Sequence, residues 1–192
     1  MANCITRHIP NAVTCCNLFS GCVAIVYTYA GDYKTALAFI VLGAVFDFFD
    51  GLLARALHAY SPIGKELDSL ADDVTFGVAP SFMVFSLLKE MTLPVALAFA
   101  ADYIPYAAFL IAAFSALRLA KFNVDTRQAS SFIGMPTPAN ALFWGSLIVG
   151  AHDFLLSSNS LSYVILALIA LTSWLLVAEI PMFSLKFKNL SW

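Results

Sequence analysis

The sequence predicts an all-α fold, a polytopic membrane bundle of six transmembrane helices, and three observations support this prediction. Hydrophobic residues make up 61% of the 192-residue chain and charged residues only 11%, whereas a typical soluble domain has about 25% charged residues. The mean hydropathy is +0.84. The apolar residues also gather into runs near the roughly 20 residues that a spanning helix requires. We therefore expect most of the surface to face membrane lipid.

The predicted spans follow one another without a low-complexity linker, which indicates a single domain over residues 1–192. They cover Asn11–Ala30, Thr35–Leu57, Asp68–Leu88, Tyr103–Ala120, Thr137–Ala151 and Leu161–Met182. The fifth is short for a span. The apolar run Thr92–Ala101 is too brief to cross a bilayer, so it either extends the third helix or lies at the interface.

The basic residues predict the orientation, because cytoplasmic loops carry an excess of lysine and arginine. With six spans, both termini and the 58–67 and 121–136 loops share one side. Lys34 and Lys89 fall on the other side, and eight basic residues fall on the shared side: Arg7, Arg55, Lys65, Arg118, Lys121, Arg127, Lys186 and Lys188. We therefore expect an integral protein of the cell membrane with its termini in the cytoplasm. A net charge of −2 does not indicate a nucleic-acid partner.

The second and third predicted spans contain carboxylates, each of which costs about 2.5–3.5 kcal/mol inside a bilayer when ionised. Asp47 and Asp50 are three residues apart, and Asp68 and Asp72 are four apart. On helices such pairs share a face, and the short loop between the spans predicts antiparallel neighbours. The carboxylates then converge and repel one another unless cations intervene.

Oxygen ligands of this kind favour Mg²⁺, Mn²⁺ or Ca²⁺, and two such ions about 3.5–4 Å apart suit phosphoryl displacement. Small residues accompany the acids: Gly51, Ala54 and Gly64 leave room for a backbone or a nucleotide to approach closely. Arg55 is suited to bind a phosphate as a planar fork. From periodicity alone, solvated acids near a loop are an open alternative.

From Asp47 to Asp72 the chain reads Asp-x2-Asp-Gly-x2-Ala-Arg-x8-Gly-x3-Asp-x3-Asp. At every fixed position this pattern resembles the signature of the CDP-alcohol phosphotransferase family. The resemblance implies two divalent cations, Mg²⁺ or Mn²⁺ with Ca²⁺ as another occupant, on Asp47, Asp50, Asp68 and Asp72. It also implies that Asp72 is the general base. Asp73 lies outside the signature and is expected to be a structural acid.

The resemblance further implies a cytoplasmic active site, a homodimer and direct transfer of a phosphatidyl group from CDP-diacylglycerol to an alcohol. The residues it implies for binding CDP-diacylglycerol are Pro10, Asn11, Thr14, Gly51, Arg55 and Ser61.

Beyond the signature, the chain resembles the bacterial and archaeal phosphatidylserine synthase branch of the family. The segments concerned are Ile9–Asn17, Leu67–Asp72, Phe76–Pro80, Ala116–Asn123 and Phe132–Ala139. It departs from that branch at Asp73, Met135 and Asn140. The resemblance implies L-serine as the acceptor, whose carboxylate requires a cation that the metals do not occupy. Arg118 and Lys121, three residues apart, are the candidates, with Asn123 and Thr137 as polar partners.

Two alternatives to serine transfer are considered. A sibling transferase would use glycerol 3-phosphate or inositol phosphate, and a denser basic cluster would favour such phosphate-bearing acceptors. A cation or proton transporter also uses intramembrane carboxylates. A transporter, however, has no need for Gly51, Ala54, Arg55 and Gly64 at these intervals.

Overall fold

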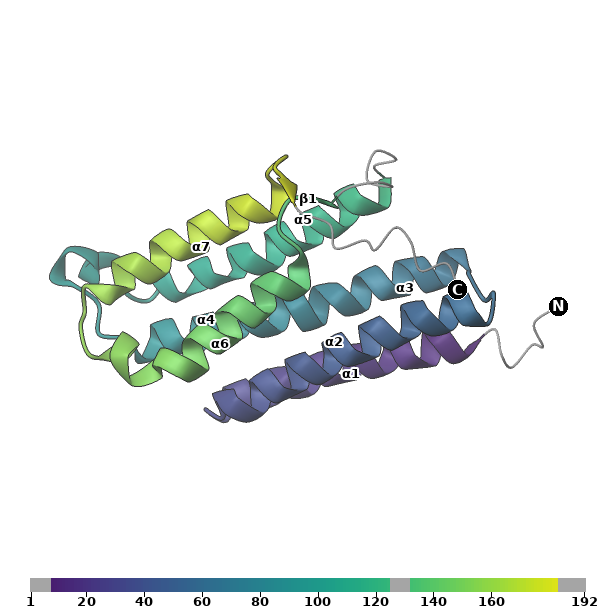
Figure 1. Ribbon diagram of the computed structural model, residues 1–192. Helices are drawn as coiled ribbons and strands as arrows, with labels where there is room; N and C mark the ends of the chain where they lie inside the picture. The colour runs from purple at the N-terminus through teal and green to yellow at the C-terminus, as the bar shows by residue number, and fades with distance from the viewer. Residues whose placement is uncertain (1–7, 125–131, 183–192) are drawn as a thin grey trace.

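The structure, a computed structural model, describes residues 8–124 and 132–182, and its helices lie side by side along one direction (Figure 1). Four of the basic residues used for the orientation, namely Arg7, Arg127, Lys186 and Lys188, lie outside the described residues.

Two hairpins flank one long central segment. The first hairpin consists of α1 (Ile9–Tyr29) and α2 (Tyr33–Ala56), and the second of α6 (Thr137–Leu156) and α7 (Leu161–Val177). The long segment runs through α3 (Pro62–Asp72), the π-helical η2 (Asp73–Val78) and α4 (Ala79–Glu90). The 3-10 segments η3 (Val95–Ala100) and η4 (Ile104–Phe109) lead into α5 (Leu110–Val124). Two short strands, β1 (Phe132–Ile133) and β2 (Pro181–Met182), pair antiparallel.

The helices account for the predicted spans. Within the described residues, five helical segments are long and apolar enough to cross a membrane: 9–29, 33–56, 62–90, 104–124 and 137–156. The sixth, Leu161–Val177, is apolar but shorter. The chain is therefore an all-α, polytopic integral membrane protein, and the count agrees with the six predicted spans.

Several predicted boundaries are wrong for local reasons. The third helix begins at Pro62 rather than Asp68, because Ser61 caps it by accepting a hydrogen bond from Gly64 N at 2.9 Å. The fifth continues past a kink at Ala151 to Leu156. The sixth ends at Val177, and residues 181–182 pair with 132–133 instead. The 92–101 run does not extend the third helix, which ends at Glu90.

The packing centres on η2, which contacts α1, α2, α5 and α6. Thr75 of η2 is fully buried and donates a hydrogen bond to the Asn17 carbonyl at 3.0 Å. Two glycines receive it: a Cβ on Gly21 would lie 2.8 Å from Thr75 Cα, and one on Gly43 would lie 2.5 Å from Thr75 Cγ2. Because Gly21 of α1 and Gly43 of α2 have no side chain, both helices can approach the central segment closely.

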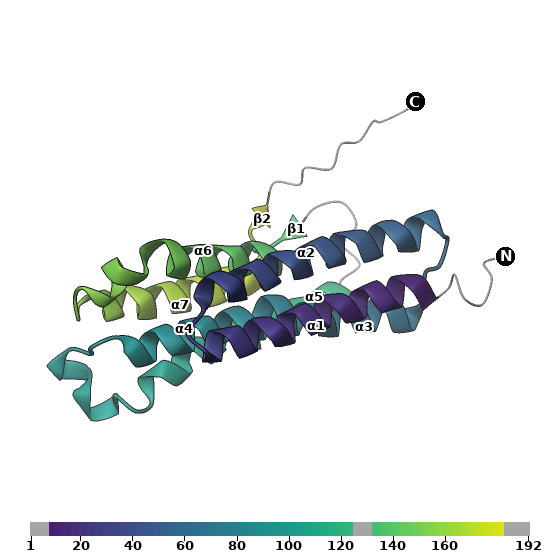
Figure 2. The ribbon, with the colours of Figure 1, turned by 90° about the horizontal axis from the view of Figure 1, so that it is seen from below.

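The two ends of the bundle differ. Seen from below, α1 and α2 meet where they join and spread apart toward the end at which α3 begins (Figure 2). At the joined end, Tyr33 donates a hydrogen bond to Glu90, and His152 Nε2 lies 2.9 Å from Glu90 Oε2. In the α1–α2 connection, Asp32 caps α2 by accepting from Thr35 N at 3.0 Å, which lowers the pKa of its carboxyl group. Polar contacts thus connect the helices at the joined end, whereas α1 and α2 diverge at the other end.

The close approach at Gly21 generates a stability prediction. Gly21→Ala should lower the free energy of unfolding by about 1–3 kcal/mol, the usual effect of overpacking, because the new methyl group meets the backbone of Thr75. Thermal unfolding of the purified protein in detergent measures it.

Gly150→Ala is the matched control, since a Cβ on Gly150 meets nothing within 4 Å and alanine favours the helix. A larger loss of stability for Gly150→Ala than for Gly21→Ala would contradict the packing described above.

Candidate functional site

Three of the four predicted metal ligands converge where α2 and α3 face each other. One carboxylate oxygen each from Asp47, Asp50 and Asp68 lie within 4.8 Å of one another. Asp50 is 5% exposed, and the other two are partly buried. Asp68 Oδ1 is buried and accepts no hydrogen bond from any described residue. The antiparallel arrangement predicted for these two helices thus brings the acids together.

The fourth acid, Asp72, lies one turn deeper along α3 and is not one of this close group. It is still near enough to interact electrostatically with Asp47, Asp68 and Asp50. Its Oδ1 accepts a hydrogen bond from Asn17 Nδ2 at 3.1 Å. Asp72 is therefore held by a neutral donor from α1, outside the group of three acids.

Helix α1 supplies the donors that hold two of the acids. Thr14 donates to Asp50 Oδ2 at 2.5 Å, and its hydroxyl also lies 3.1 Å from the Pro10 carbonyl. Asn17, which is fully buried, reaches Asp72 in the same way. Thr14 and Asn17 are three residues apart, so they share one face of α1. Sequence reasoning placed Asn17 in a resembling segment but gave it no role; its three-residue spacing from Thr14 was the available signal.

The donor set fits a hard divalent cation. It consists of carboxylate oxygens, which suit Mg²⁺, Mn²⁺ or Ca²⁺ and not softer metals. A buried oxygen without a partner, Asp68 Oδ1, is what a cation would satisfy. Mutual repulsion among the acids is removed by the same ion. The geometry alone supports one cation on the group of three acids.

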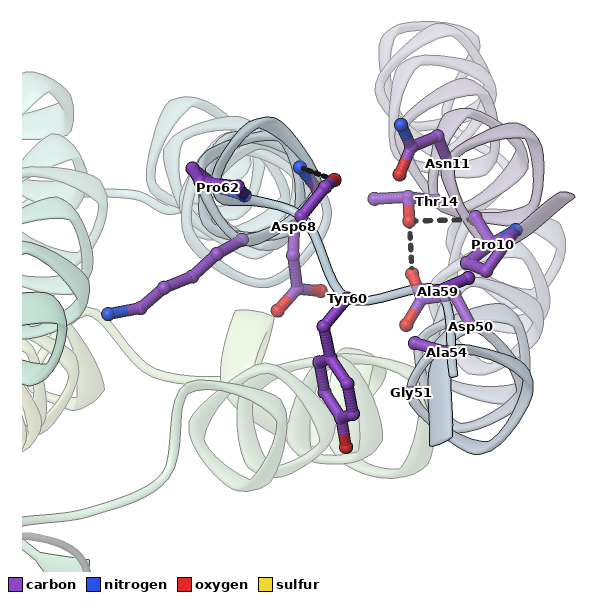
Figure 3. A pocket seen from close by; sticks show the side chains of 13 residues that line it. Pro10, Asn11, Thr14, Asp50, Gly51, Ala54, Ala59, Tyr60, Pro62 and Asp68 are labelled. Carbon is purple, nitrogen blue, oxygen red and sulfur yellow. Dashed lines mark hydrogen bonds between the residues drawn. The ribbon is translucent and has the colours of Figure 1, made fainter. Parts of the chain in front are cut away.

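A cavity of about 480 Å³ opens beside this group, between α1, α2 and the start of α3. Figure 3 shows Asp68 on one side of it and Asp50 on the other, where Asp50 lies beside Thr14 and Pro10. Its lining residues are Pro10, Asn11, Thr14, Asp50, Gly51, Ala54, Ala59, Tyr60, Ser61, Pro62, Gly64, Lys65 and Asp68. The cavity therefore joins residues far apart in sequence to two of the converging carboxylates.

Five of the six residues predicted to bind the donor line this cavity: Pro10, Asn11, Thr14, Gly51 and Ser61. The sixth, Arg55, is exposed, and one of its guanidinium nitrogens lies 4.0 Å from the position of a Cβ on Gly51. Gly64 is needed for space, since a Cβ there would lie 2.9 Å from Asn11 Oδ1 and 3.0 Å from Ser61 Oγ. Tyr60 and Lys65 also line the cavity, and sequence reasoning did not single them out for it.

The four residues predicted to bind the acceptor are placed differently from one another. Arg118 is only 8% exposed and interacts electrostatically with Asp72. Thr137 is 1% exposed in the first turn of α6. Asn123 donates to Ser69 Oγ at 2.8 Å and accepts from Lys65 Nζ at its carbonyl, and Lys121 is exposed. Among these four, the structure thus brings Arg118 to the acids.

Comparison with known proteins identifies relatives along most of the chain. The sequence model of the CDP-alcohol phosphatidyltransferase family matches residues 7–182. A CDP-diacylglycerol–serine O-phosphatidyltransferase of Bacillus subtilis (strain 168) is 41% identical over 133 residues, which is 69% of this chain and 70% of that protein.

Proteins with the same name are found in Helicobacter pylori and Mycobacterium tuberculosis. The one from Helicobacter pylori (strain ATCC 700392 / 26695) is 30% identical over 187 residues, 95% of this chain and 74% of that protein. The one from Mycobacterium tuberculosis (strain ATCC 25618 / H37Rv) is 34% identical over 182 residues, which is 91% of this chain and 60% of that protein.

The acid group generates a prediction about cation binding that needs no substrate. The purified protein should bind Mn²⁺, and Asp68→Asn should weaken that binding at least about tenfold, since loss of a residue that merely supports a metal ligand already costs about 10–100-fold in affinity. Electron paramagnetic resonance of free Mn²⁺ measures the effect.

Glu66→Gln is the control, because Glu66 is an exposed acid two residues away on α3. Equal losses of Mn²⁺ affinity in the two variants would show that binding reflects overall charge and not this site.

Proposed function

The chain belongs to the CDP-alcohol phosphatidyltransferase family, and from this premise we propose that it transfers the phosphatidyl group of CDP-diacylglycerol to L-serine. The products are phosphatidylserine and CMP. The relatives named above, each a CDP-diacylglycerol–serine O-phosphatidyltransferase, support serine as the acceptor. The observation that carries the proposal is the cavity whose wall includes Asp50 and Asp68, because a phosphate bound there lies beside the acids that would hold a divalent cation.

The donor's head group occupies the cavity, and its acyl chains extend into lipid. Thr14, already fixed against Asp50, and Ser61, fixed at the start of α3, present hydroxyl oxygens to it. Gly51 and Gly64 leave room for the nucleotide, because side chains at either position would reduce the space that the cavity offers. Arg55 beside Gly51 pairs with a phosphate as a planar, permanently charged fork.

Asp47, Asp50, Asp68 and Asp72 would hold two divalent cations, Mg²⁺ or Mn²⁺. When bound, such ions neutralise phosphate charge and stabilise the attacking and leaving oxygens of a displacement. Three of the acids already have an oxygen each within 4.8 Å of the others. Asp72, one turn further along α3, would be the fourth ligand.

Asp72 accepts the proton of the serine hydroxyl. The hydrogen bond from Asn17 occupies its Oδ1 and leaves Oδ2 to take the proton. The serine oxygen attacks the β-phosphorus, an O–P bond forms, and the bond from that phosphorus to the CMP oxygen breaks. CMP leaves with the electron pair of that bond. No covalent enzyme intermediate is required, and Arg118, near Asp72, provides a cation for the serine carboxylate.

Product identification tests this function. The purified protein is supplied with CDP-diacylglycerol, Mg²⁺ or Mn²⁺ and a panel of labelled alcohols that includes L-serine, glycerol 3-phosphate and inositol phosphate. We expect phosphatidylserine and CMP in equal amounts, and no product in excess chelator. Phosphatidylglycerol phosphate or an inositol lipid as the main product would refute serine transfer.

The assignment of Asp72 generates a kinetic prediction. Asp72→Asn keeps the size of the side chain but cannot accept the proton, so kcat should fall at least about a hundredfold. The KM for CDP-diacylglycerol should stay near the wild-type value because the lining of the cavity is unchanged.

Asp102→Asn makes the same chemical change on an exposed loop residue and should leave kcat unaltered. A wild-type kcat in Asp72→Asn would require another base.

We also propose that the site faces the cytoplasm of the cell membrane, with both termini on that side. The support is the predicted excess of basic residues there, together with the end of the bundle where α1 and α2 diverge and α3 begins. Reporter fusions at each terminus should both report cytoplasm, and opposite locations would contradict the orientation.

The family resemblance further implies a homodimer, which the mass of the detergent-solubilised protein tests.

A further inference from the structure

A second group of polar side chains is carried by η2 and by two helices that pack on it, α5 and α6. The described residues offer no hydrogen-bond partner to five of its buried atoms: Asp73 Oδ1, Ser115 Oγ, Arg118 Nε, and both Asn140 Nδ2 and Oδ1. Ser115 and Asn140 are fully buried, and Arg118 is 8% exposed. Buried polar groups are nearly always hydrogen-bonded in proteins, so a set of unpartnered ones points to a missing ligand.

Geometry connects these residues. A Cβ on Gly77 would lie 2.8 Å from Asp73 Oδ1 and 3.5 Å from Ser115 Oγ, so both groups lie around one glycine at the contact of η2 with α5. Ser115 and Arg118 are three residues apart on α5 and share a face. Arg118 also interacts electrostatically with Asp72. Asn140, near the start of α6, belongs to a helix that also packs on η2.

The chemistry of the group matches a zwitterion. It contains one cation, Arg118, whose Nε has no hydrogen-bond partner among the described residues, and one anion, Asp73, whose Oδ1 has none either. An acceptor that carried only phosphate would be attracted by Arg118 and repelled by Asp73. An α-amino acid satisfies both, because it offers a carboxylate and an ammonium group about one carbon apart.

We propose that Asp73, Ser115, Arg118 and Asn140 form the subsite for the amino-acid part of the acceptor. This inference rests on the proposed function, and it assigns a residue to the ammonium group. Arg118 binds the α-carboxylate, and Asp73 binds the α-ammonium with Ser115 beside it. Asn140 supplies an amide that can both donate and accept. The side-chain hydroxyl is then directed toward Asp72, the neighbour of Arg118.

This arrangement makes Asp73 a specificity-determining residue, although at the level of sequence it is expected to be a structural acid. Asp72 and Asp73 are consecutive, so they point about 100° apart around the helix. One faces Asn17 of α1 and the converging acids, and the other faces Gly77 and Ser115. Asp72 thereby accepts the proton of the reacting hydroxyl, and Asp73 binds the ammonium group.

The test compares L-serine with two analogues, each of which lacks one charged group. 3-Hydroxypropionate keeps the hydroxyl and the carboxylate but has no ammonium group, and ethanolamine keeps the hydroxyl and the ammonium group but has no carboxylate. Values of kcat/KM are measured for each acceptor with the wild type, Asp73→Asn, Arg118→Gln and the exposed control Asp153→Asn.

We expect Asp73→Asn to raise the KM for L-serine about tenfold or more, the usual effect of removing a charged hydrogen-bond partner, with the KM for CDP-diacylglycerol unchanged. It should narrow the preference for L-serine over 3-hydroxypropionate and leave the preference over ethanolamine intact. Arg118→Gln should narrow the preference for L-serine over ethanolamine and leave the preference over 3-hydroxypropionate intact. Asp153→Asn should change neither preference. A serine KM within twofold of wild type in Asp73→Asn, or equal effects on both preferences, would overturn the subsite.

The wild type alone provides a second measurement if a variant fails to fold. It should prefer L-serine over each analogue by at least about a hundredfold, as sites built to bond a polar group do. Use of 3-hydroxypropionate within threefold of L-serine would overturn the inference while the proposed function stands. Transfer to glycerol 3-phosphate with none to L-serine would instead overturn the proposed function.

Discussion

Carboxylates that must lie together inside a membrane protein determine the arrangement of the rest of this structure. Asp47, Asp50 and Asp68 bring oxygens within 4.8 Å of one another, and Asp72 follows one turn later. Each charge is costly near lipid, and their mutual repulsion adds to the cost. A cation bound among them offsets both terms. The antiparallel course of α2 and α3 is what makes that binding possible.

Helix α1 gives chemically identical acids different surroundings, because it places a different hydrogen-bond donor against each of two of them. Thr14 donates to Asp50 beside the cavity, and Asn17 donates to Asp72 in the interior. Neither donor carries a charge, so each fixes the position of an oxygen without competing with a cation for the negative charge. The result is a group of three acids, two of which line the cavity, and a fourth acid directed toward the interior, where Arg118 lies. The acids of one helix pair are thus divided between the cavity and the interior of the bundle.

The π-helical segment η2 connects these two sides. It begins immediately after Asp72 and contacts α1, α2, α5 and α6. A π-helical segment changes the direction of the side chains that follow it, and such segments occur frequently at functional sites. Here Thr75 enters the space left by Gly21 and Gly43, whereas Gly77 admits Asp73 and Ser115 at the opposite contact. Local helix geometry therefore fixes the relative position of the acids and the interior polar group.

The sequence by itself determined the features that depend on neighbours along the chain. Length and hydropathy set the number of spans, and the spacing of Asp47, Asp50, Asp68 and Asp72 placed each pair on one helix face, because both signals follow from helix periodicity. Ser61 followed by Pro62 was a readable helix start that the span prediction missed. Tertiary structure alone decided which acids form the close group, that Asn17 holds Asp72, and that Arg118 is buried while Lys121 is exposed. These outcomes depend on how η2 packs against α1, α5 and α6, and contacts between segments far apart in sequence leave no periodic pattern in any one of them.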